Sequence, residues 1–484
     1  MSIPLPPRAV PAAANLAPAR RSGLLAIFQP DPPAAVRLTD HAAVREGYRT
    51  GQINVLLWAI VGYALFYFVR KNLSLAMPVM GKELGIGKEQ LGLFLTLHGV
   101  LYGVSKFANG FLGDRANART FLAAGLGLSA LTNVAFGFSS TSLLFGVFWM
   151  LNGWFQGMGF PPCARLMTHW FSPQELATKM SVWNTSHSIG AGCVVVLCGY
   201  LLTWFGNWRL CFFVPAAMAI AGAVLMLFTL PDTPASVGLP DVEGTTVAAG
   251  DGAPTDDRVT SRTLDYAGPA TEAQDFRSFV RTHVFGNYYI WVIAAANFFV
   301  YAVRYAVLDW GPTLLNEAKH IDLSKVGWMV AAFEVSGVVG MLTSGWLTDR
   351  VFGGRGARTC VVSMAGCVGA VLLLWLYPGR SAAAYTVILC LAGFFIYGPQ
   401  ALVGISVANL ATKRAAATAV GLTGVFGYAS TVLSGWGLGR LVQSYGWDRG
   451  FQAMFVVAVL GTVAFALAWP AKAHGYAADP SAPR

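Results

Sequence analysis

Long apolar runs separated by short polar loops make up most of the chain. A helix that crosses the hydrocarbon core of a bilayer needs about 20 consecutive apolar residues. Twelve such runs lie at residues 53–78, 90–112, 120–138, 142–166, 180–205, 209–230, 287–314, 325–348, 359–377, 383–409, 414–442 and 449–470. Charged residues make up 12% of the chain and hydrophobic residues 55%, which excludes a soluble globular domain of this length. The pattern predicts an all-α membrane protein with twelve transmembrane helices.

Basic residues mark one set of loops. An even number of spans places both termini on one side, and lysines and arginines accumulate in cytoplasmic loops. The loops on the side of the termini carry Arg20, Arg21, Arg37, Arg45, Arg49, Arg115, Arg119, Arg350, Arg355, Arg358, Lys413 and Arg414. We therefore expect both termini to be cytoplasmic. The formal charge of +10 follows from this topology, and no basic patch interleaved with aromatic residues indicates a nucleic-acid partner.

Polar segments divide the chain into two halves. Residues 1–50 are rich in Pro and Ala and lack the apolar core of a signal peptide, so we expect a cytoplasmic tail. Residues 231–285 are polar and rich in Gly, Pro, Thr and Asp, which predicts a flexible cytoplasmic linker. This linker separates an N-terminal six-helix half (51–230) from a C-terminal six-helix half (286–471). Residues 472–484 form a second cytoplasmic tail.

The two halves repeat the same landmarks at a nearly constant offset. Asp114 in GFLGDRANAR and Asp349 in GWLTDRVFGGRGAR lie 235 positions apart, and Arg70 and Arg304 lie 234 apart. Parallel six-helix repeats related by an axis along the membrane normal place a substrate site near the midplane, between the halves. The pattern resembles the major facilitator architecture, with two pseudo-symmetric halves.

The two Gly-x-x-x-Asp-Arg segments have a mechanical interpretation. Asp114, Arg115, Asp349 and Arg350 can pair with helix ends across the cytoplasmic seam and so favour an outward-facing state until they separate. The alternative is a merely polar loop, but the motif recurs at the same place in both halves.

Two arginines lie inside apolar runs. Apolar sequence continues from Arg70 to Met80, and Arg304 is preceded by ANFFVYAV and followed by YAVLDWGPTLL. An arginine at membrane depth costs roughly 2.5 to 3.5 kcal/mol on insertion scales, so its default interpretation is functional. The alternative is an anchor that reaches the lipid headgroups. Converging guanidiniums from opposite halves suit one tetrahedral dianion, because each planar fork can donate to two phosphate oxygens.

Other polar side chains share the helix faces of these arginines. Tyr63 and Tyr67 lie seven and three residues before Arg70, and Tyr102 and Lys106 are spaced i, i+4. We predict that they line the central cavity. Lys71 lies about 100 degrees round the helix from Arg70 and is either a membrane anchor or a supporting group.

Three further ionisable residues lie within apolar runs. His187 is either a buried histidine satisfied by a neighbour or a ligand whose charge follows that of the phosphate. Asp309 and Glu334 are expected to hold the arginines or lysines in place when no anion is bound. His98 and His169 stay unassigned.

The residues also indicate a family. The segments GYALFYFVRKNLSLAMP, YGVSKF, NGWFQGMGFPPCAR, SVWNTSH, VYAVRYAVLDWGPTLL, FEVSG and YGPQALVGI resemble those of the organophosphate:phosphate antiporter family of the major facilitator superfamily. The resemblance runs from about residue 24 to about residue 470. It implies a bacterial inner-membrane carrier that exchanges cytosolic inorganic phosphate for an external phosphate monoester, with glycerol-3-phosphate the expected one. Asn184 and Tyr397, within these segments, join the candidate substrate ligands.

Departures from the family leave the organic part of the substrate open. Ser188 follows the histidine, and TKRAAATAVG lacks the Pro and Gly of the related loop. GYALFYF and YGPQ are similar to segments of hexose-phosphate proteins. The alternatives are a hexose-6-phosphate or phosphoglycerate transporter, or a membrane sensor of hexose phosphates that signals to a histidine kinase.

No cofactor, metal or enzymatic motif is indicated. The seven cysteines show no CxxC pairing and are interpreted as packing residues. The expected partners are the phosphate monoester, inorganic phosphate and the lipid bilayer, and a monomer is expected.

Overall fold

The computed structural model describes residues 28–113, 116–171, 179–180, 182–240, 280–379, 381–411 and 416–471. Within these residues the regular secondary structure is helical throughout. The helices of the N-terminal half are α1 (His41–Leu84), α2 (Lys88–Gly113), α3 (Ala118–Phe138), α4 (Ser142–Gln156), α5 (Phe160–Trp170), α7 (Ser186–Phe205) and α8 (Leu210–Thr229). Those of the C-terminal half are α11 (Tyr288–Glu317), α12 (Leu323–Arg350), α13 (Gly356–Leu376), α14 (Ala382–Ala411), α15 (Ala416–Ala429), the π-helix η5 (Val432–Gly437) and α16 (Leu438–Leu467).

Ten helical segments of the described chain are long and apolar enough to cross a membrane. The predicted fourth span is not among them because it is broken between α4 and α5, where Pro161 and Pro162 begin a new helix. One segment, Thr418–Leu467, is 50 residues long and contains the predicted eleventh and twelfth spans. Gly446 interrupts it with a left-handed φ of 80°. The ten segments therefore correspond to eleven of the twelve predicted spans, and α4 and α5 together occupy the place of the fourth.

Helix α1 is longer than the apolar run that predicts it. It begins at His41, where the Asp40 carboxylate accepts a hydrogen bond from the Ala43 N–H at 3.0 Å, and it continues six residues beyond Pro78. Val69 is non-helical within it, with φ −98° and ψ 16°. The helix is therefore kinked directly before Arg70.

The first ten residues of the predicted linker are ordered against the N-terminal half. Residues 231–240 include the 3-10 turn η2 (Pro234–Val237), and the N–H groups of Ala34 and Leu38 donate to the carbonyls of Ala235 and Gly238. The described chain resumes at Val280 with the π-helix η4 (Arg281–Phe285). Residues 231–240 and 280–285 of the predicted linker thus adopt defined backbone structure, and residues 241–279 lie outside the described residues.

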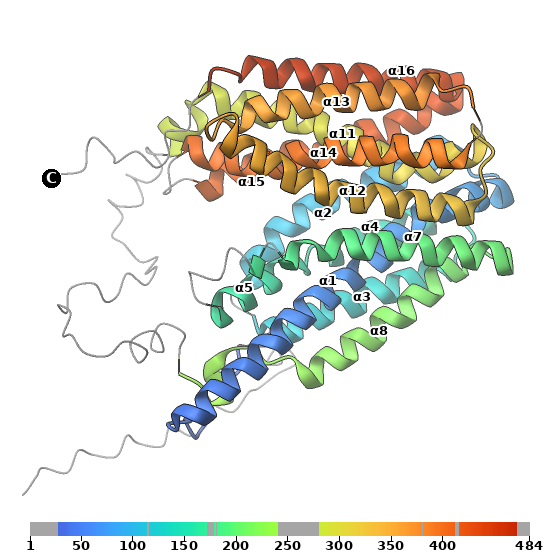
Figure 1. The fold of residues 1–484 in the computed structure, drawn as a ribbon. Coiled ribbons are helices and arrows are strands. Elements are labelled where there is room, and N and C mark those ends of the chain that lie inside the picture. Colours follow the sequence, from blue (N-terminus) through green and yellow to red (C-terminus); the bar gives the residue numbers. More distant parts are fainter. Residues whose placement is uncertain are drawn as a thin grey trace, which may run out of the picture.

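The two halves pack against each other along two seams. Helix α7 packs on α12, and α2 packs on η5. Gly92 and Gly99 of α2 leave room for the backbone of Gly435 and the side chain of Thr431, and Gly327 of α12 lies against the Val195 carbonyl. These contacts lie toward the end at which α1 finishes. In Figure 1 the halves diverge in the opposite direction, toward the left, where α1 begins.

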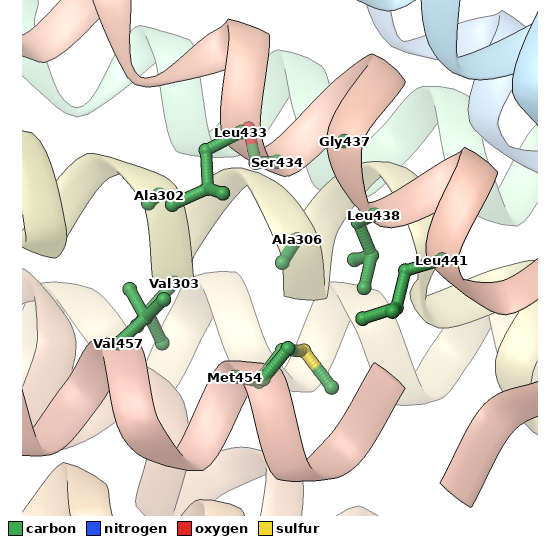
Figure 2. A pocket seen from close by; sticks show the side chains of 11 residues that line it. Ala302, Val303, Ala306, Leu433, Ser434, Gly437, Leu438, Leu441, Met454 and Val457 are labelled. Carbon is green, nitrogen blue, oxygen red and sulfur yellow. The ribbon is translucent and has the colours of Figure 1, made fainter. Parts of the chain in front are cut away.

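A cavity of about 170 Å³ lies within the C-terminal half, between α11, η5 and α16. Figure 2 shows its lining, which is apolar apart from Ser434. It contains no charged side chain, so it does not suit an anion. The charged residues predicted from the sequence lie elsewhere.

Candidate functional site

Arg304 of α11 is fixed by a short polar chain inside the C-terminal half. Its guanidinium donates to the Tyr397 hydroxyl of α14 at 2.9 Å, and that hydroxyl donates to the Glu334 carboxylate of α12 at 2.5 Å. The exposed fractions of the three residues are 5%, 0% and 1%. Arg304 is therefore deeply buried, and the orientation of its guanidinium is set by the hydrogen bond to Tyr397 and not by a direct ion pair.

Arg70 of α1 has a different environment. Its guanidinium carbon lies 4.1 Å from the centre of the Tyr102 ring of α2 and 5.3 Å from that of Tyr67. Both distances are within the range of cation–π attraction. Arg70 is partly exposed, whereas Tyr102 is buried. The side chain thus rests on aromatic faces.

His187 of α7 links the two arginine environments. Its ring stacks on that of Tyr397 at 6.4 Å with an interplanar angle of 12°, and it lies 5.8 Å from the ring of Tyr67. Its Nδ1 contacts the Asn184 carbonyl, while its buried Nε2 has no hydrogen-bond partner within the described residues. The N-terminal and C-terminal groups therefore meet at this histidine.

Lys71 forms an ion pair across the two halves. Its Nζ lies 2.6 Å from the Asp309 carboxylate of α11, and the side chains are 9% and 16% exposed. The Lys71 Nζ is also 5.3 Å from the centre of the Tyr305 ring. Lys71 is consequently not a headgroup anchor, and Asp309 contacts this lysine and not Arg304.

The remaining predicted residues lie around this centre. Tyr63 is buried one turn before Tyr67 in α1, and its ring centre lies 5.2 Å from that of Trp183. Lys106 lies 4.3 Å above the Phe160 ring and 6.0 Å from that of Tyr428. The side chain of Asn184 is exposed, so its carbonyl and not its amide contacts His187.

The structure places the two Asp-Arg pairs away from this centre or leaves them undescribed. Asp349 and Arg350 are exposed at the end of α12. Asp114 and Arg115 lie outside the described residues. The seam contact expected of these pairs stays a prediction.

Two tyrosines of the site were missed in the sequence. Tyr305 lies beside Arg304 and faces Lys71, while Tyr428 of α15 packs edge-on against Tyr102 at 5.1 Å. Tyr305 adjoins an intramembrane arginine, which is a usable signal. Tyr428 lies in GLTGVFGYAS, which contains no charge, so only the tertiary packing of α15 on α2 reveals it.

The centre as a whole is rich in donors and positive charge. None of the ion pairs within the described ranges involves Arg70 or Arg304. The buried Nε of Arg304 and Nε2 of His187 have no hydrogen-bond partner among the residues described. Buried charges without a counter-charge are costly. Two guanidiniums, an imidazole and several phenols form a donor set that suits a tetrahedral oxyanion.

Comparison with known proteins places the chain in a family. The model of the Major Facilitator Superfamily matches residues 59–435. The glycerol-3-phosphate transporter of Bacillus subtilis is 38% identical over 456 residues, which cover 92% of this chain and 98% of that protein. The probable hexose phosphate transport protein of Chlamydia pneumoniae is 37% identical and covers 92% and 96%. The membrane sensor protein UhpC of Escherichia coli is 34% identical and covers 89% and 95%.

Solved structures agree on the fold. A bacterial homolog of the human lysosomal transporter Spinster, in an inward-facing and unoccupied conformation, matches with a TM-score of 0.64 at 15% identity and covers 86% of this chain and 95% of that one. The relatives and the apolar helices together indicate a multi-pass membrane protein. The chain belongs to the major facilitator superfamily, within its organophosphate:phosphate antiporter group.

Proposed function

We propose that the protein exchanges cytosolic inorganic phosphate for an external phosphate monoester, with one phosphate group held between Arg70 and Arg304. The observation that carries this proposal is the meeting of the two arginine environments at His187, which is 5.8 Å from the Tyr67 ring and 6.4 Å from the Tyr397 ring. Neither arginine has a carboxylate partner among the described ion pairs. A dianion would supply the missing charge, and each guanidinium can donate bidentately to it.

Glycerol-3-phosphate is the substrate that we propose first. Support comes from relatives at 38% and 36% identity that are named glycerol-3-phosphate transporters. Relatives at 37% and 38% identity are named probable hexose phosphate transport proteins, and one at 30% is named a phosphoglycerate transporter protein. The phosphate is the shared part of these compounds, and it is the part that the arginines would bind.

Strict exchange follows from the cost of closing an empty site. Rotating the halves together over two guanidiniums without an anion would bury uncompensated charge, which is strongly unfavourable. A bound phosphate removes this obstacle, so only a loaded carrier would reorient. Tyr63, Tyr67, Tyr102, Lys106, His187 and Tyr397 would complete the ligand shell, and Asn184 would contribute its carbonyl to the orientation of His187.

The remaining charged groups would regulate reorientation. Glu334 acts on Arg304 through Tyr397, and Asp309 pairs with Lys71 across the halves. We assign Asp114, Arg115, Asp349 and Arg350 to the cytoplasmic seam. With both termini cytoplasmic in a bacterial inner membrane, the diverging ends of the halves in Figure 1 would face the cytoplasm, so the conformation would be inward-facing.

Phosphate-loaded proteoliposomes test the proposal. External glycerol-3-phosphate, glucose-6-phosphate, phosphoglycerate or phosphate is added, and release of labelled internal phosphate is followed. We expect rapid release with at least one monoester and with phosphate itself, and little release without an external substrate. Absence of phosphate-dependent counterflow with all four compounds would refute the carrier proposal.

A sensor is the second candidate, because the chain is 34% identical to the membrane sensor protein UhpC over 89% of its length. In that case the same site would bind a hexose phosphate and the protein would signal to a membrane histidine kinase. Phosphate-ester binding without counterflow in the same proteoliposomes would favour this function.

A further inference from the structure

The kink in α1 directly before Arg70 is held open by side-chain amides from two other helices. The Val69 carbonyl accepts hydrogen bonds from Asn133 Nδ2 of α3 at 2.9 Å and from Asn152 Nδ2 of α4 at 2.8 Å. One turn earlier, the Phe66 carbonyl accepts from Gln156 Nε2 at 3.0 Å. We call Asn133, Asn152 and Gln156 the amide clamp.

The amide clamp gives a physical cause for the kink. A carbonyl oxygen has two lone pairs, and at Val69 both are directed to side-chain amides. Side chains that insert into the backbone hydrogen-bond ladder are an established cause of sharp helix bends. Val69 has φ −98° and ψ 16°, outside the helical region. The bend therefore lies where the amides enter.

Burying the polar side chains of the clamp costs folding free energy, which indicates a role beyond packing. Asn133 and Asn152 are fully buried and Gln156 is 3% exposed. The Asn152 Oδ1 has no hydrogen-bond partner within the described chain. A buried polar atom without a partner destabilises the fold, and an apolar side chain of the same shape would avoid that cost.

The described residues of the C-terminal half contain no counterpart of the clamp. Gly153 of α4 lies against the His98 backbone, and Gly393 of α14 lies in the same way against that of Phe333. The neighbours of Gly393 that correspond to Asn152 and Gln156 are Ala392 and Ile396. Helix α13 contains no asparagine or glutamine, and α11, described throughout, runs without a non-helical residue past Arg304.

The position of the kink decides what it can control. Tyr63 and Tyr67 precede Val69, whereas Arg70 and Lys71 follow it. The bend thus sets the direction of the two cations relative to the two tyrosines. Arg304 has the Tyr397 hydroxyl to fix its direction, while the Arg70 guanidinium lies against aromatic faces.

We propose that Asn133, Asn152 and Gln156 are positioning residues for Arg70: they hold α1 open at Val69 and so direct the guanidinium toward the phosphate. This inference rests on the proposed function. The two arginines would then be oriented in different ways. The Arg304 guanidinium is oriented by a hydrogen bond from its own side chain, and the Arg70 guanidinium by the bend of its backbone.

Inorganic phosphate binding to the full-length protein in lipid nanodiscs tests the proposal. Asn152→Leu keeps the branched shape of the side chain and removes one donor to Val69. We expect it to raise the phosphate Kd about tenfold, since small misplacements of a binding group are costly. Asn297→Leu is the matched control. Asn297 is 3% exposed and donates to the Thr423 carbonyl at 2.8 Å, within the C-terminal half. The phosphate Kd of Asn297→Leu should change less than about twofold.

A double-mutant cycle separates positioning from general stability. In the Arg70→Lys background a flexible lysine replaces the oriented fork, so Asn152→Leu should have little further effect on the Kd. Equal effects in both backgrounds, or an equal loss in Asn297→Leu, would overturn the proposal. If Asn152→Leu does not fold, Gln156→Met carries the same comparison. Wild-type protein that fails to bind phosphate would refute the proposed function, whereas normal binding by folded clamp variants would refute only this inference.

Discussion

At the scale of the residue, two arginines at matching places of the halves are held by different physics. Arg304 is oriented by a hydrogen bond to Tyr397, which in turn donates to Glu334. Arg70 lies against the rings of Tyr67 and Tyr102. A hydrogen-bonded chain fixes a guanidinium more tightly than ring contacts do, because its geometry is directional.

Removal of one hydroxyl tests the fixed arginine. Tyr397→Phe keeps the ring that stacks on His187 but leaves the Glu334 carboxylate without its 2.5 Å donor. Hydrogen bonds to charged groups contribute roughly 1.5 to 3 kcal/mol, so we expect the phosphate Kd to rise about tenfold or more. Isothermal titration or equilibrium binding measures this change.

Tyr385→Phe is the control for that substitution. Tyr385 is 1% exposed and its hydroxyl donates to the Tyr377 carbonyl at 3.1 Å, also in the C-terminal half. Its loss should lower stability slightly and leave the phosphate Kd unchanged. Equal effects of the two substitutions on the Kd would contradict the role of Tyr397.

Charged members of the site were accessible from the sequence, and aromatic members were only partly so. A charge within an apolar run is conspicuous because it is costly there, which identifies Arg70, Arg304 and Lys71. The pairing of Lys71 with Asp309 joins residues 238 positions apart, so no local pattern indicates it. Tyr428 carries no such signal.

At the scale of the element, the π-helix η5 forms part of the seam with α2. The Thr96 hydroxyl of α2 donates to the Thr431 carbonyl at 2.8 Å and accepts from the Trp436 N–H at 2.8 Å. Thr431 directly precedes η5 and Trp436 lies within it, where a π-helix leaves the normal hydrogen-bond ladder incomplete. Thr96, which belongs to the N-terminal half, therefore provides hydrogen-bond partners for backbone groups of the C-terminal half that η5 leaves unpaired.

Thr96→Val tests this contact because it changes one hydroxyl to a methyl. Both backbone groups would lose their partner, at a cost of about 1 to 3 kcal/mol each when buried. We expect the halves to separate more often at this end, seen as faster hydrogen–deuterium exchange in peptides that cover 88–99 and 431–443. Thr132→Val is the control, since its hydroxyl donates to Ser129 within α3. Unchanged exchange in Thr96→Val would contradict the role of the contact.

Two interruptions of helices differ in whether the sequence predicts them. Pro161 and Pro162 break the fourth span in a way that a proline pattern explains. The kink at Val69 has no local cause, because its donors come from Asn133 and Asn152, 64 and 83 residues away. Elements are predictable from the apolar pattern, whereas bends imposed by tertiary contacts are not.

At the scale of the whole molecule, the halves are joined by charges as well as by packing. The Lys71–Asp309 pair is largely buried, with N···O at 2.6 Å, whereas the Lys88–Glu317 pair has a distance of 2.9 Å and side chains 28% and 35% exposed. Breaking a buried pair leaves one charge uncompensated, but an exposed pair contributes little. The constant sequence offset between the halves predicted this two-fold arrangement. The contacts between the halves could be identified only from the structure.

Neutralising the buried pair should be non-additive. Lys71→Met or Asp309→Leu alone should destabilise the protein by roughly 3 to 5 kcal/mol, and the double substitution by much less, because no charge is left unpaired. Thermal unfolding of the three variants measures this difference. The same cycle at Lys88 and Glu317 should give effects below about 1 kcal/mol. A double variant as unstable as the summed single variants would contradict the pairing.

The central claim is that one phosphate group binds Arg70 and Arg304 together, and a double-mutant cycle on the inorganic phosphate Kd tests it most directly. Arg70→Lys and Arg304→Lys should each weaken binding about tenfold to a hundredfold, since a point charge loses the bidentate fork. Once one guanidinium is replaced, the phosphate can shift in the site. The loss of binding free energy in the double variant should therefore be smaller than the sum of the two single losses by about 1 kcal/mol or more. Strictly additive losses, or near wild-type affinity in either single variant, would contradict the claim.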